Sequence, residues 1–485
     1  MPDFSCDLTQ SSKPFEHFWE HTVGSGHAPL GLRADWQEQL HRCHDELGIC
    51  HVRFHGALSN PMGTLICEEE KLLYSFFNLD RIIDFLLSVG MKPFLELSFM
   101  PETLASGDTR VFRYQSNVTP PKDYTEWAAL IKKLIGHFAE RYGKREVSQW
   151  LFEVWNEPNL ESFWTGSQQD YFELYANTVE AVKSVDGSFK VGGPATAQSE
   201  WVEPFLNFCE KNKLPADFVS THYYPTDAFG QIGADTLTQL ANAPRDVMRQ
   251  RAAAVRNQAG ERALYYTEWN ISSNPRDPLH DRPFAAAYAV HILMGVSGLV
   301  DGYSFWTFSD IFEENYFPSV PFHGGFGLLN LYGIPKPVYR AFELMHGLGN
   351  EQIDVTGEHE TVEAWGFKKS HQTQLLLSNH AQPRHPIQAE LVNIQLSGAE
   401  NPSRVYIERI DAEHANPREV WEEMGEPEYL SSFDVDDLKA ASRLVSEPMP
   451  VSFDDGTINL SLEMPPQGVA RITLEFAEEF ANKEK

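Results

Sequence analysis

Two glutamates, each at the end of a short apolar run, are the residues of this sequence best placed to do chemistry together. Glu157 lies in the segment 155–159, Trp-Asn-Glu-Pro-Asn, and Glu268 lies in 267–270, Thr-Glu-Trp-Asn. The runs before them are rich in aromatic and aliphatic residues, which predicts strands that each deliver one carboxylate. If one group is a carboxylic acid and the other a carboxylate, the first can protonate a glycosidic oxygen while the second attacks the anomeric carbon.

The elements that must position this pair alternate along residues 15–348. Apolar runs of strand length are followed by amphipathic helical patterns, which predicts a parallel sheet covered by helices. The expected strands are 15–23, 49–55, 93–99, 150–154, 190–193, 218–222, 263–268 and 302–307. The expected helices are 36–47, 81–89, 125–142, 170–185, 201–212, 245–258, 284–294 and 338–348, with Asp35 and Asp80 as the N-caps of the first two.

This alternation predicts a (β/α)8 TIM barrel, in which catalytic groups lie at the carboxyl ends of the strands. Glu157 and Glu268 then end the fourth and seventh strands. The first strand, 15–23, is the most polar, and without it the two glutamates would end the third and sixth. The alternative is that both are non-catalytic carboxylates of surface loops, as most glutamates are.

The pattern changes after residue 348. Six strand-length runs separated by Gly, Pro, Asn and Asp predict a C-terminal antiparallel β-sandwich domain over 349–485, which would brace the barrel. Residues 1–14 are short and polar, and we expect them to add an edge strand to a distant sheet. The acidic segment 417–440 is expected to be a long loop or a short helix. The runs are 362–367, 373–377, 388–394, 404–410, 458–462 and 470–476.

Composition limits the partners. The formal charge is −30, which opposes binding to nucleic acid and favours a neutral ligand. Five cysteines in no close pairs indicate neither a disulfide framework nor a zinc site. We find no secretory leader in residues 1–20 and no membrane span, since 283–300 is interrupted by polar residues. A cytoplasmic protein acting on small substrates is the resulting expectation.

The Asn-Glu-Pro and Thr-Glu pair resembles the signatures of retaining (β/α)8-barrel glycosidases, and more narrowly the chain is similar to glycoside hydrolase family 39, the β-xylosidases. The resemblance implies that Glu157 is the acid/base and Glu268 the nucleophile. It covers residues 15–345, with further motifs at 53–56 (Arg-Phe-His-Gly), 221–225 (Thr-His-Tyr-Tyr-Pro), 304–308 (Ser-Phe-Trp-Thr-Phe), 310–314 (Asp-Ile-Phe-Glu-Glu) and 322–327 (Phe-His-Gly-Gly-Phe-Gly).

The same resemblance implies the residues that bind the sugar. They are His55, Asn156, His222, Tyr224, Trp306, Glu313 and Glu314. Tyr224 would donate its hydroxyl to the nucleophile, and Trp306 would form the floor of the sugar pocket. For neighbouring residues a structural role competes: Asn159 could cap a turn, Tyr223 could be core, and Phe305 or Phe308 is expected to pack inside.

The function that the resemblance implies is a retaining exo-glycosidase that hydrolyses β-1,4-xylosidic bonds and releases xylose from short xylo-oligosaccharides. It would need no metal and no cofactor, because two carboxylates do the covalent and proton-transfer work. Arabinosidase or xylanase side activity stays open, as does a homo-oligomer. An iduronidase-type activity is disfavoured because no Arg or Lys flanks Glu157, His222 or Glu268, and a non-catalytic carbohydrate-binding protein because both glutamates are intact.

Overall fold

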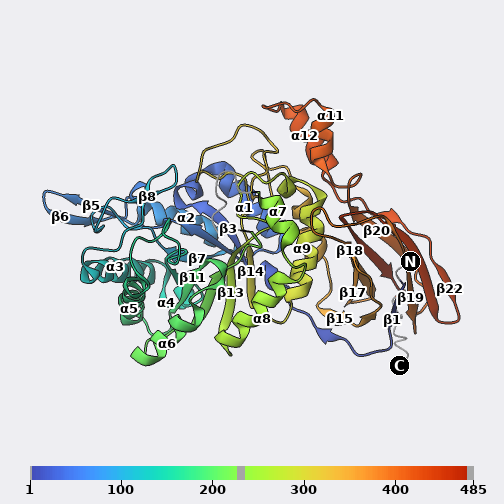
Figure 1. The fold of residues 1–485 in the computed structure, drawn as a ribbon, viewed down its shortest axis with the longest axis horizontal. Coiled ribbons are helices and arrows are strands. Elements are labelled where there is room, and N and C mark those ends of the chain that lie inside the picture. The colour runs from blue at the N-terminus through green and yellow to red at the C-terminus, as the bar shows by residue number, and fades with distance from the viewer. Residues whose placement is uncertain (1–2, 227–234, 478–485) are drawn as a thin grey trace, which may run out of the picture.

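A closed barrel of eight parallel strands forms the larger part of the molecule (Figure 1). The computed structural model describes residues 3–226 and 235–477. Around the barrel the strands are β3 (Thr22–His27), β4 (His51–His55), β7 (Lys92–Leu97), β10 (Leu151–Val154), β11 (Lys190–Thr196), β12 (Phe218–His222), β13 (Ala263–Trp269) and β14 (Gly302–Phe305). The TIM-barrel prediction is confirmed, and β10 and β13 are its fourth and seventh strands.

The expected first strand, 15–23, was wrong in position. Residues Phe18–Glu20 form a 3-10 helix, η1, and the strand is Thr22–His27. Its sequence, Thr-Val-Gly-Ser-Gly-His, is fully buried yet has little apolar character, so no hydrophobic run marks it. Gly24 is needed there, because a β-carbon would lie 2.5 Å from the Trp306 ring.

Helices surround the barrel: α1 (Ala34–Leu47), α2 (Phe77–Ser88), α3 (Tyr124–Tyr142), α5 (Gln168–Val185), α6 (Val202–Asn212), α8 (Val247–Ala259), α9 (Pro283–Val296) and α10 (Pro337–His346). Their order confirms the predicted alternation, but two caps were wrong. Asp35 lies inside α1, where its carboxylate pairs with Arg33. Asp80 lies inside α2, which begins one turn earlier, and it pairs with His137 of α3 at 2.7 Å.

Shorter elements decorate the loops between these strands and helices. They are η2 (Ala28–Leu32), η3 (Asn60–Met62), β5 (Leu65–Glu68), β6 (Lys71–Tyr74), β8 (Arg110–Val111), β9 (Ser116–Asn117), α4 (Lys144–Val147), η4 (Ala197–Ser199), α7 (Thr236–Asn242) and η5 (Pro278–Asp281). In the described residues, no helix is both long enough and apolar enough to cross a membrane.

The barrel interior has two layers of opposite character. Side chains alternate inward and outward along each strand, so residues two apart fall in successive layers. Phe94, Leu151 and Phe218 pack together as an apolar layer. Two residues further along β7 and β10 stand Glu96 and Glu153, which are fully buried. An apolar plug therefore closes the barrel below a charged layer that faces its mouth.

Two further sheets stack beside the barrel and enclose a separate apolar core. One contains β16 (Val355–Thr356), β1 (Asp3–Asp7), β19 (Glu390–Ser397), β23 (Thr457–Met464) and β22 (Ser452–Asp454). The other contains β2 (Lys13–Pro14), β15 (Glu351–Ile353), β17 (Val362–Lys369), β18 (Gln372–Asn379), β24 (Gly468–Glu475), β20 (Arg404–Ile410) and β21 (Glu447–Pro448). These sheets are the predicted sandwich.

The amino-terminal residues join both sheets. β2 is an edge strand, as expected for residues 1–14, but β1 lies between β16 and β19. It pairs in parallel with β19, so the sandwich is antiparallel except at this pair. The division of the chain at residue 348 stays a prediction, since strands from both ends of the sequence build the sandwich.

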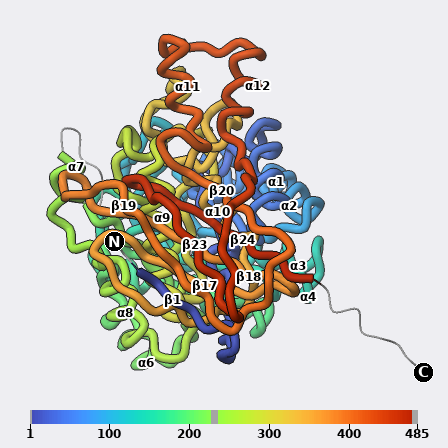
Figure 2. The backbone as a smooth tube through the Cα atoms, turned by 90° about the vertical axis from the view of Figure 1, so that its right-hand side faces the viewer, coloured from blue at the N-terminus to red at the C-terminus, as the bar shows by residue number. Residues whose placement is uncertain are grey.

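Helix α9 packs between the barrel and the sandwich (Figure 1), and nearly all of its residues are buried. His291 of this helix pairs with Glu363 of β17 at 2.6 Å, and Ser378 of β18 donates to the Ala287 carbonyl. The acidic segment forms two helices, α11 (Pro417–Glu423) and α12 (Ser432–Ala441), which project beyond the sandwich strands (Figure 2).

Candidate active site

The loop after β10 places Glu157 by an unusual backbone path. Trp155 and Glu157 both have positive φ, 71° and 43°, a conformation that L side chains seldom adopt. Trp155 is buried among aromatic rings and donates its indole N–H to the Phe163 carbonyl at 2.9 Å. The Glu157 amide donates to the Ala195 carbonyl of β11 at 2.8 Å. Packing on both sides thus holds a strained turn that leaves Glu157 buried at the barrel mouth.

Glu268 lies near the end of β13, and four side chains approach its carboxylate, one of them His222 with Nδ1 3.7 Å from Oε2. Arg53 of β4 contributes an N–H to Oε1 at 2.7 Å, and the Tyr224 hydroxyl donates to Oε2 at 3.1 Å. His55 Nε2 lies 3.7 Å from Oε1. Arg53 and His55 both belong to β4, whereas Tyr224 follows β12. The hydrogen bonds from Arg53 and Tyr224 favour an ionised, fixed carboxylate.

The two glutamates face each other closely. A carboxylate oxygen of Glu157, one of Glu268 and a ring nitrogen of His222 all lie within 4.8 Å of one another. Burial raises the pKa of Glu157 well above its usual range, and the charge of Glu268 adds to this effect. Burial also raises the pKa of Glu268, but the Arg53 guanidinium opposes it. The surroundings therefore favour the protonated form more strongly at Glu157 than at Glu268.

His222 connects Glu157 to the next strand. Its Nδ1 lies 2.9 Å from Glu157 Oε1, and its Nε2 lies 3.0 Å from the Thr267 hydroxyl. The ring is fully buried, which holds its pKa well below the usual range, and the nearby Arg53 guanidinium lowers it further. Both effects favour the neutral imidazole.

Glu313 and Glu314 occupy different environments. Burial raises the pKa of Glu314 well above its usual range, with the charges of Glu268 and Glu96 contributing, and its Oε1 lies 3.6 Å from His55 Nε2. Glu313 is more exposed and contacts His27 at 3.4 Å. The structure brings Glu314 to the carboxylate pair and leaves Glu313 at the margin.

Trp306 lies against the same site. It is 3% exposed and packs with Tyr224, Phe326 and Phe312. Its ring centroid lies 4.8 Å from that of His55. The 322–327 loop supplies Phe326, which backs this cluster. Phe305 and Phe308 belong instead to the main barrel core, as does Tyr223, in agreement with the structural roles weighed for them.

Asn156 and Asn159 diverge although they are three residues apart. Asn156 is buried, and its amide oxygen accepts from Arg53 at 2.9 Å. Asn159 exchanges hydrogen bonds with the backbone of Ala197. Asn156 belongs to the site, whereas Asn159 fastens its loop to the one after β11.

Sequence reasoning missed three charged residues of the site, which are Arg53, Glu96 and Glu153. All are fully buried, and the guanidinium pairs with both glutamates and with Glu268. No Arg flanks Glu268 in the sequence, yet Arg53 reaches it from β4 across the barrel. A signal was present in the sequence: each of these charges lies between two apolar neighbours of a strand, where a charge needs a buried partner.

A buried ion triad fixes the 322–327 loop. Lys336 Nζ lies 2.7 Å from both Asp281 and Asp310 and 2.9 Å from the Gly325 carbonyl, and all three side chains are inaccessible to solvent. Asp310 also accepts from the Gly327 amide. Lys336 is the cation that both carboxylates share, and Arg418 lies 3.4 Å from Asp281 as a second, more distant partner. The loop that carries Phe326 therefore depends on Lys336.

Replacing Lys336 with Met is expected to destabilise the protein by about 3–5 kcal/mol, because two buried carboxylates lose the cation they share and only Asp281 keeps another, Arg418 at 3.4 Å. Thermal unfolding measures this as a lowered midpoint. The matched control is Lys13→Met, which removes an exposed pair with Asp354 and should cost less than about 1 kcal/mol. Equal midpoints for the two variants would contradict the role given to the triad.

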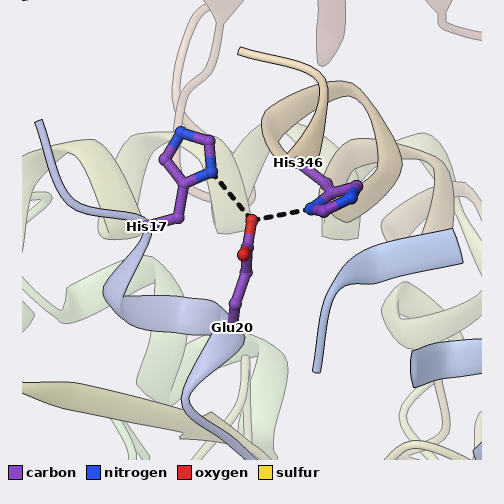
Figure 3. Close-up of side chains that lie close together, drawn as sticks. All are labelled: His17, Glu20 and His346. Atoms are coloured by element: carbon purple, nitrogen blue, oxygen red, sulfur yellow. Dashed lines mark hydrogen bonds and ion pairs between the residues drawn. The ribbon is translucent and has the colours of Figure 1, made fainter. Parts of the chain in front are cut away.

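In the described part of the chain, two groups bring three donor atoms within 4.8 Å, the spacing a metal would need. One is Glu157, His222 and Glu268. The other is His17, Glu20 and His346 (Figure 3): His17 directly precedes η1, Glu20 ends η1, and His346 ends α10. There both imidazoles point Nδ1 at the same Glu20 oxygen, each at 2.8 Å. That oxygen takes the place a metal would fill, so the geometry is that of a hydrogen-bonded bridge. Independence from metals and cofactors stays a prediction.

The barrel and the buried carboxylate pair at its mouth define a class. A (β/α)8 barrel that holds two buried, adjacent carboxylates at the ends of its fourth and seventh strands is the arrangement of a glycoside hydrolase.

Comparison with known proteins assigns the chain to a family. The model of glycosyl hydrolases family 39 matches residues 4–459, and the chain belongs to this family. A β-xylosidase of Caldicellulosiruptor saccharolyticus is 46% identical over 463 residues, 94% of this chain and 95% of that protein. A β-xylosidase of Geobacillus stearothermophilus is 38% identical over 95% of this chain and 93% of that protein. The crystal structure of a monomeric β-xylosidase from Caulobacter crescentus CB15 superposes with a TM-score of 0.86 at 32% identity, covering 98% and 100% of the two chains.

Proposed function

We propose that this glycoside hydrolase is a retaining β-xylosidase that releases xylose from the non-reducing end of short xylo-oligosaccharides. Glu157 acts as acid and then base, and Glu268 is the nucleophile. The observation that carries this proposal is the close, unequal carboxylate pair. Oxygens of the two groups lie within 4.8 Å, which suits direct attack at roughly 5–5.5 Å and leaves little room for the water that an inverting pair needs.

The roles follow from the surroundings of each group. Glu268 receives hydrogen bonds from Arg53 and Tyr224, which stabilise a carboxylate able to attack. Glu157 is held protonated by burial and by the charge of Glu268, so that it can protonate the leaving oxygen. After the first step its carboxylate takes a proton from water, whose oxygen then displaces Glu268 from the sugar.

Around this pair, the remaining residues are proposed to bind the terminal sugar. Asn156 donates to the 2-hydroxyl, a contact that strengthens in the transition state. Trp306 offers an apolar ring face beside the pair. His55, Glu314 and, at the margin, Glu313 accept or donate to the other hydroxyls. His222 acts on Glu157, with which it shares a hydrogen bond.

Xylose is favoured as the sugar because two relatives that match nearly the whole chain are named β-xylosidases. An α-L-iduronidase of Homo sapiens matches over 39% of the chain at 29% identity. An anionic sugar would need a free cation, and Arg53 is already committed to Glu96, Glu153 and Glu268. A neutral sugar therefore fits better, with arabinosidase and xylanase activities to be compared in the same assay.

Xylan degradation is the process proposed for this activity, with xylo-oligosaccharides as the neutral partner. A cytoplasmic location is proposed from the five free thiols, which fit a reducing compartment. The oligomeric state is left to solution measurement.

The early product distinguishes this mechanism from its rival. Hydrolysis of xylobiose, followed by proton NMR in the first minutes, is expected to show β-xylose before mutarotation, because two inversions restore the configuration. Early α-xylose would contradict the retaining mechanism. The same experiment on a panel of aryl glycosides tests the sugar, and faster hydrolysis of an arabinoside or glucoside than of the xyloside would overturn the substrate assignment.

A further inference from the structure

A continuous series of hydrogen bonds runs under the site and joins the two glutamates through the barrel interior. From Glu157 it passes to His222, then to Thr267, then to Glu153, then to Arg53, and ends at Glu268. The five contacts measure 2.9, 3.0, 2.8, 2.5 and 2.7 Å in that order. The proposed mechanism uses its two ends. Thr267 and Glu153, in the middle of the series, have no role in the proposed mechanism.

The direction of these hydrogen bonds can be worked out from the Arg53 end. Arg53 only donates, and it forms an ion pair with Glu153 Oε2. Glu153 is then a carboxylate, so its Oε1 must accept from the Thr267 hydroxyl. A hydroxyl has one hydrogen, and Thr267 has used it. Toward His222 it can only accept, so the hydrogen of the neutral ring lies on Nε2.

This direction has a consequence for Glu157. With its hydrogen on Nε2, the ring presents a bare Nδ1 to the Glu157 carboxyl group, 2.9 Å away. A bare nitrogen accepts a hydrogen bond from a protonated carboxyl group but offers none to a carboxylate. The arrangement therefore stabilises the protonated form of Glu157 and withholds a donor from its anion.

We propose that Thr267 and Glu153 are positioning residues that hold His222 in the Nε2–H tautomer, and that this tautomer keeps Glu157 a strong proton acceptor. No proton passes along the series. It fixes which ring nitrogen carries the hydrogen, while Glu157 gives its proton to the leaving oxygen in the first step and takes one from water in the second. The proposal rests on the function proposed for Glu157.

Other charged groups act on the same carboxyl group and must be counted with the ring. Glu157 is influenced by Glu268, Arg53, Glu314 and Glu96, and His222 by Arg53 and His55. Substituting Thr267 leaves all of them in place. Thr267 is itself buried and does not contact Glu157 in the series, so a change in Glu157 after its substitution would pass through the ring.

The decisive variant is Thr267→Val, which keeps the shape of the side chain and removes the hydroxyl. Nε2 then has no acceptor, and the ring is free to move its hydrogen to Nδ1 and donate to the Glu157 anion. A hydrogen bond donated to the Glu157 carboxylate should lower the pKa of Glu157 by about one unit. We therefore expect the alkaline limb of the pH profile of kcat/KM for xylobiose to move about one unit toward lower pH. The matched control is Thr267→Ser, whose alkaline limb should lie at the same pH as that of the wild type.

An unmoved limb in Thr267→Val would overturn the proposal. So would a similar loss of rate in the Val and Ser variants with neither limb moved, since that pattern reports packing alone. Glu153→Gln gives a second approach, because an amide nitrogen can donate to Thr267 and release its hydroxyl hydrogen for His222. Its limb should move in the same direction as that of Thr267→Val.

A measurement on the unsubstituted protein needs no substrate and does not depend on variants that fold. Neutron diffraction of the deuterated crystal should place deuterium on His222 Nε2 and none on Nδ1, with the Thr267 deuterium directed at Glu153. Deuterium on Nδ1 would overturn the proposal whatever the enzyme hydrolyses. Conversely, failure to hydrolyse any xyloside would reject the proposed function and leave this result standing.

Discussion

Replacing Glu268 with Ala is expected to lower kcat on xylobiose by about 10⁴–10⁶-fold, the scale on which loss of a catalytic nucleophile is measured in other enzymes. The variant has no group that can form the covalent sugar intermediate, and no carboxylate remains on that face to activate a water molecule for direct attack. Activity on aryl xylosides should fall as steeply, because departure of a better leaving group does not replace the missing nucleophile. Steady-state kinetics on both substrates measure this.

The control for this variant is Glu173→Ala, which removes an exposed carboxylate from α5 and should leave the kinetics unchanged. Covalent labelling then identifies the nucleophile directly. A 2-fluoro xylosyl donor with a good leaving group should form a stable ester, and mass spectrometry of the digested protein should find it on Glu268. A label on any other residue, or substantial turnover by Glu268→Ala, would be incompatible with the assignment.

Glu157→Ala should separate substrates according to how much they need an acid. Hydrolysis of xylobiose is expected to slow by about 10²–10⁴-fold, because the departing sugar oxygen must be protonated. An aryl xyloside with a low-pKa phenol needs little protonation to leave, so its first step should be largely spared. The ratio of kcat/KM values for the two substrates measures the difference.

Small anions provide a further check on Glu157. Removing its side chain opens a space beside the anomeric carbon, and azide should enter it and produce a β-configured xylosyl azide. Glu161→Ala, which changes an exposed glutamate four residues along the same loop, is the matched control and should show neither effect. If both substrates slowed equally and azide gave no product, Glu157 would not be the acid.

Most of the fold could be predicted from local patterns. Strands such as Phe218–His222 and helices such as Tyr124–Tyr142 are marked by apolar runs and stripes that depend only on neighbouring residues. The first barrel strand could not be found in this way. Its residues are buried by the closure of the barrel and are small or polar, so they carry no local hydrophobic signal. The amino-terminal strand β1 was similarly placed by its partner β19, almost four hundred residues later.

The sequence by itself determined where the two glutamates lie, since each ends a recognisable strand and strand ends meet at one face of a barrel. The tertiary structure decided what surrounds them. Arg53, Glu96 and Glu153 come from three strands and look like isolated charges in the sequence, yet the closed barrel turns them inward to one layer. The physical reason is that a buried charge is stable only beside its partners, and these partners are brought together by closure of the sheet and not by their spacing along the chain.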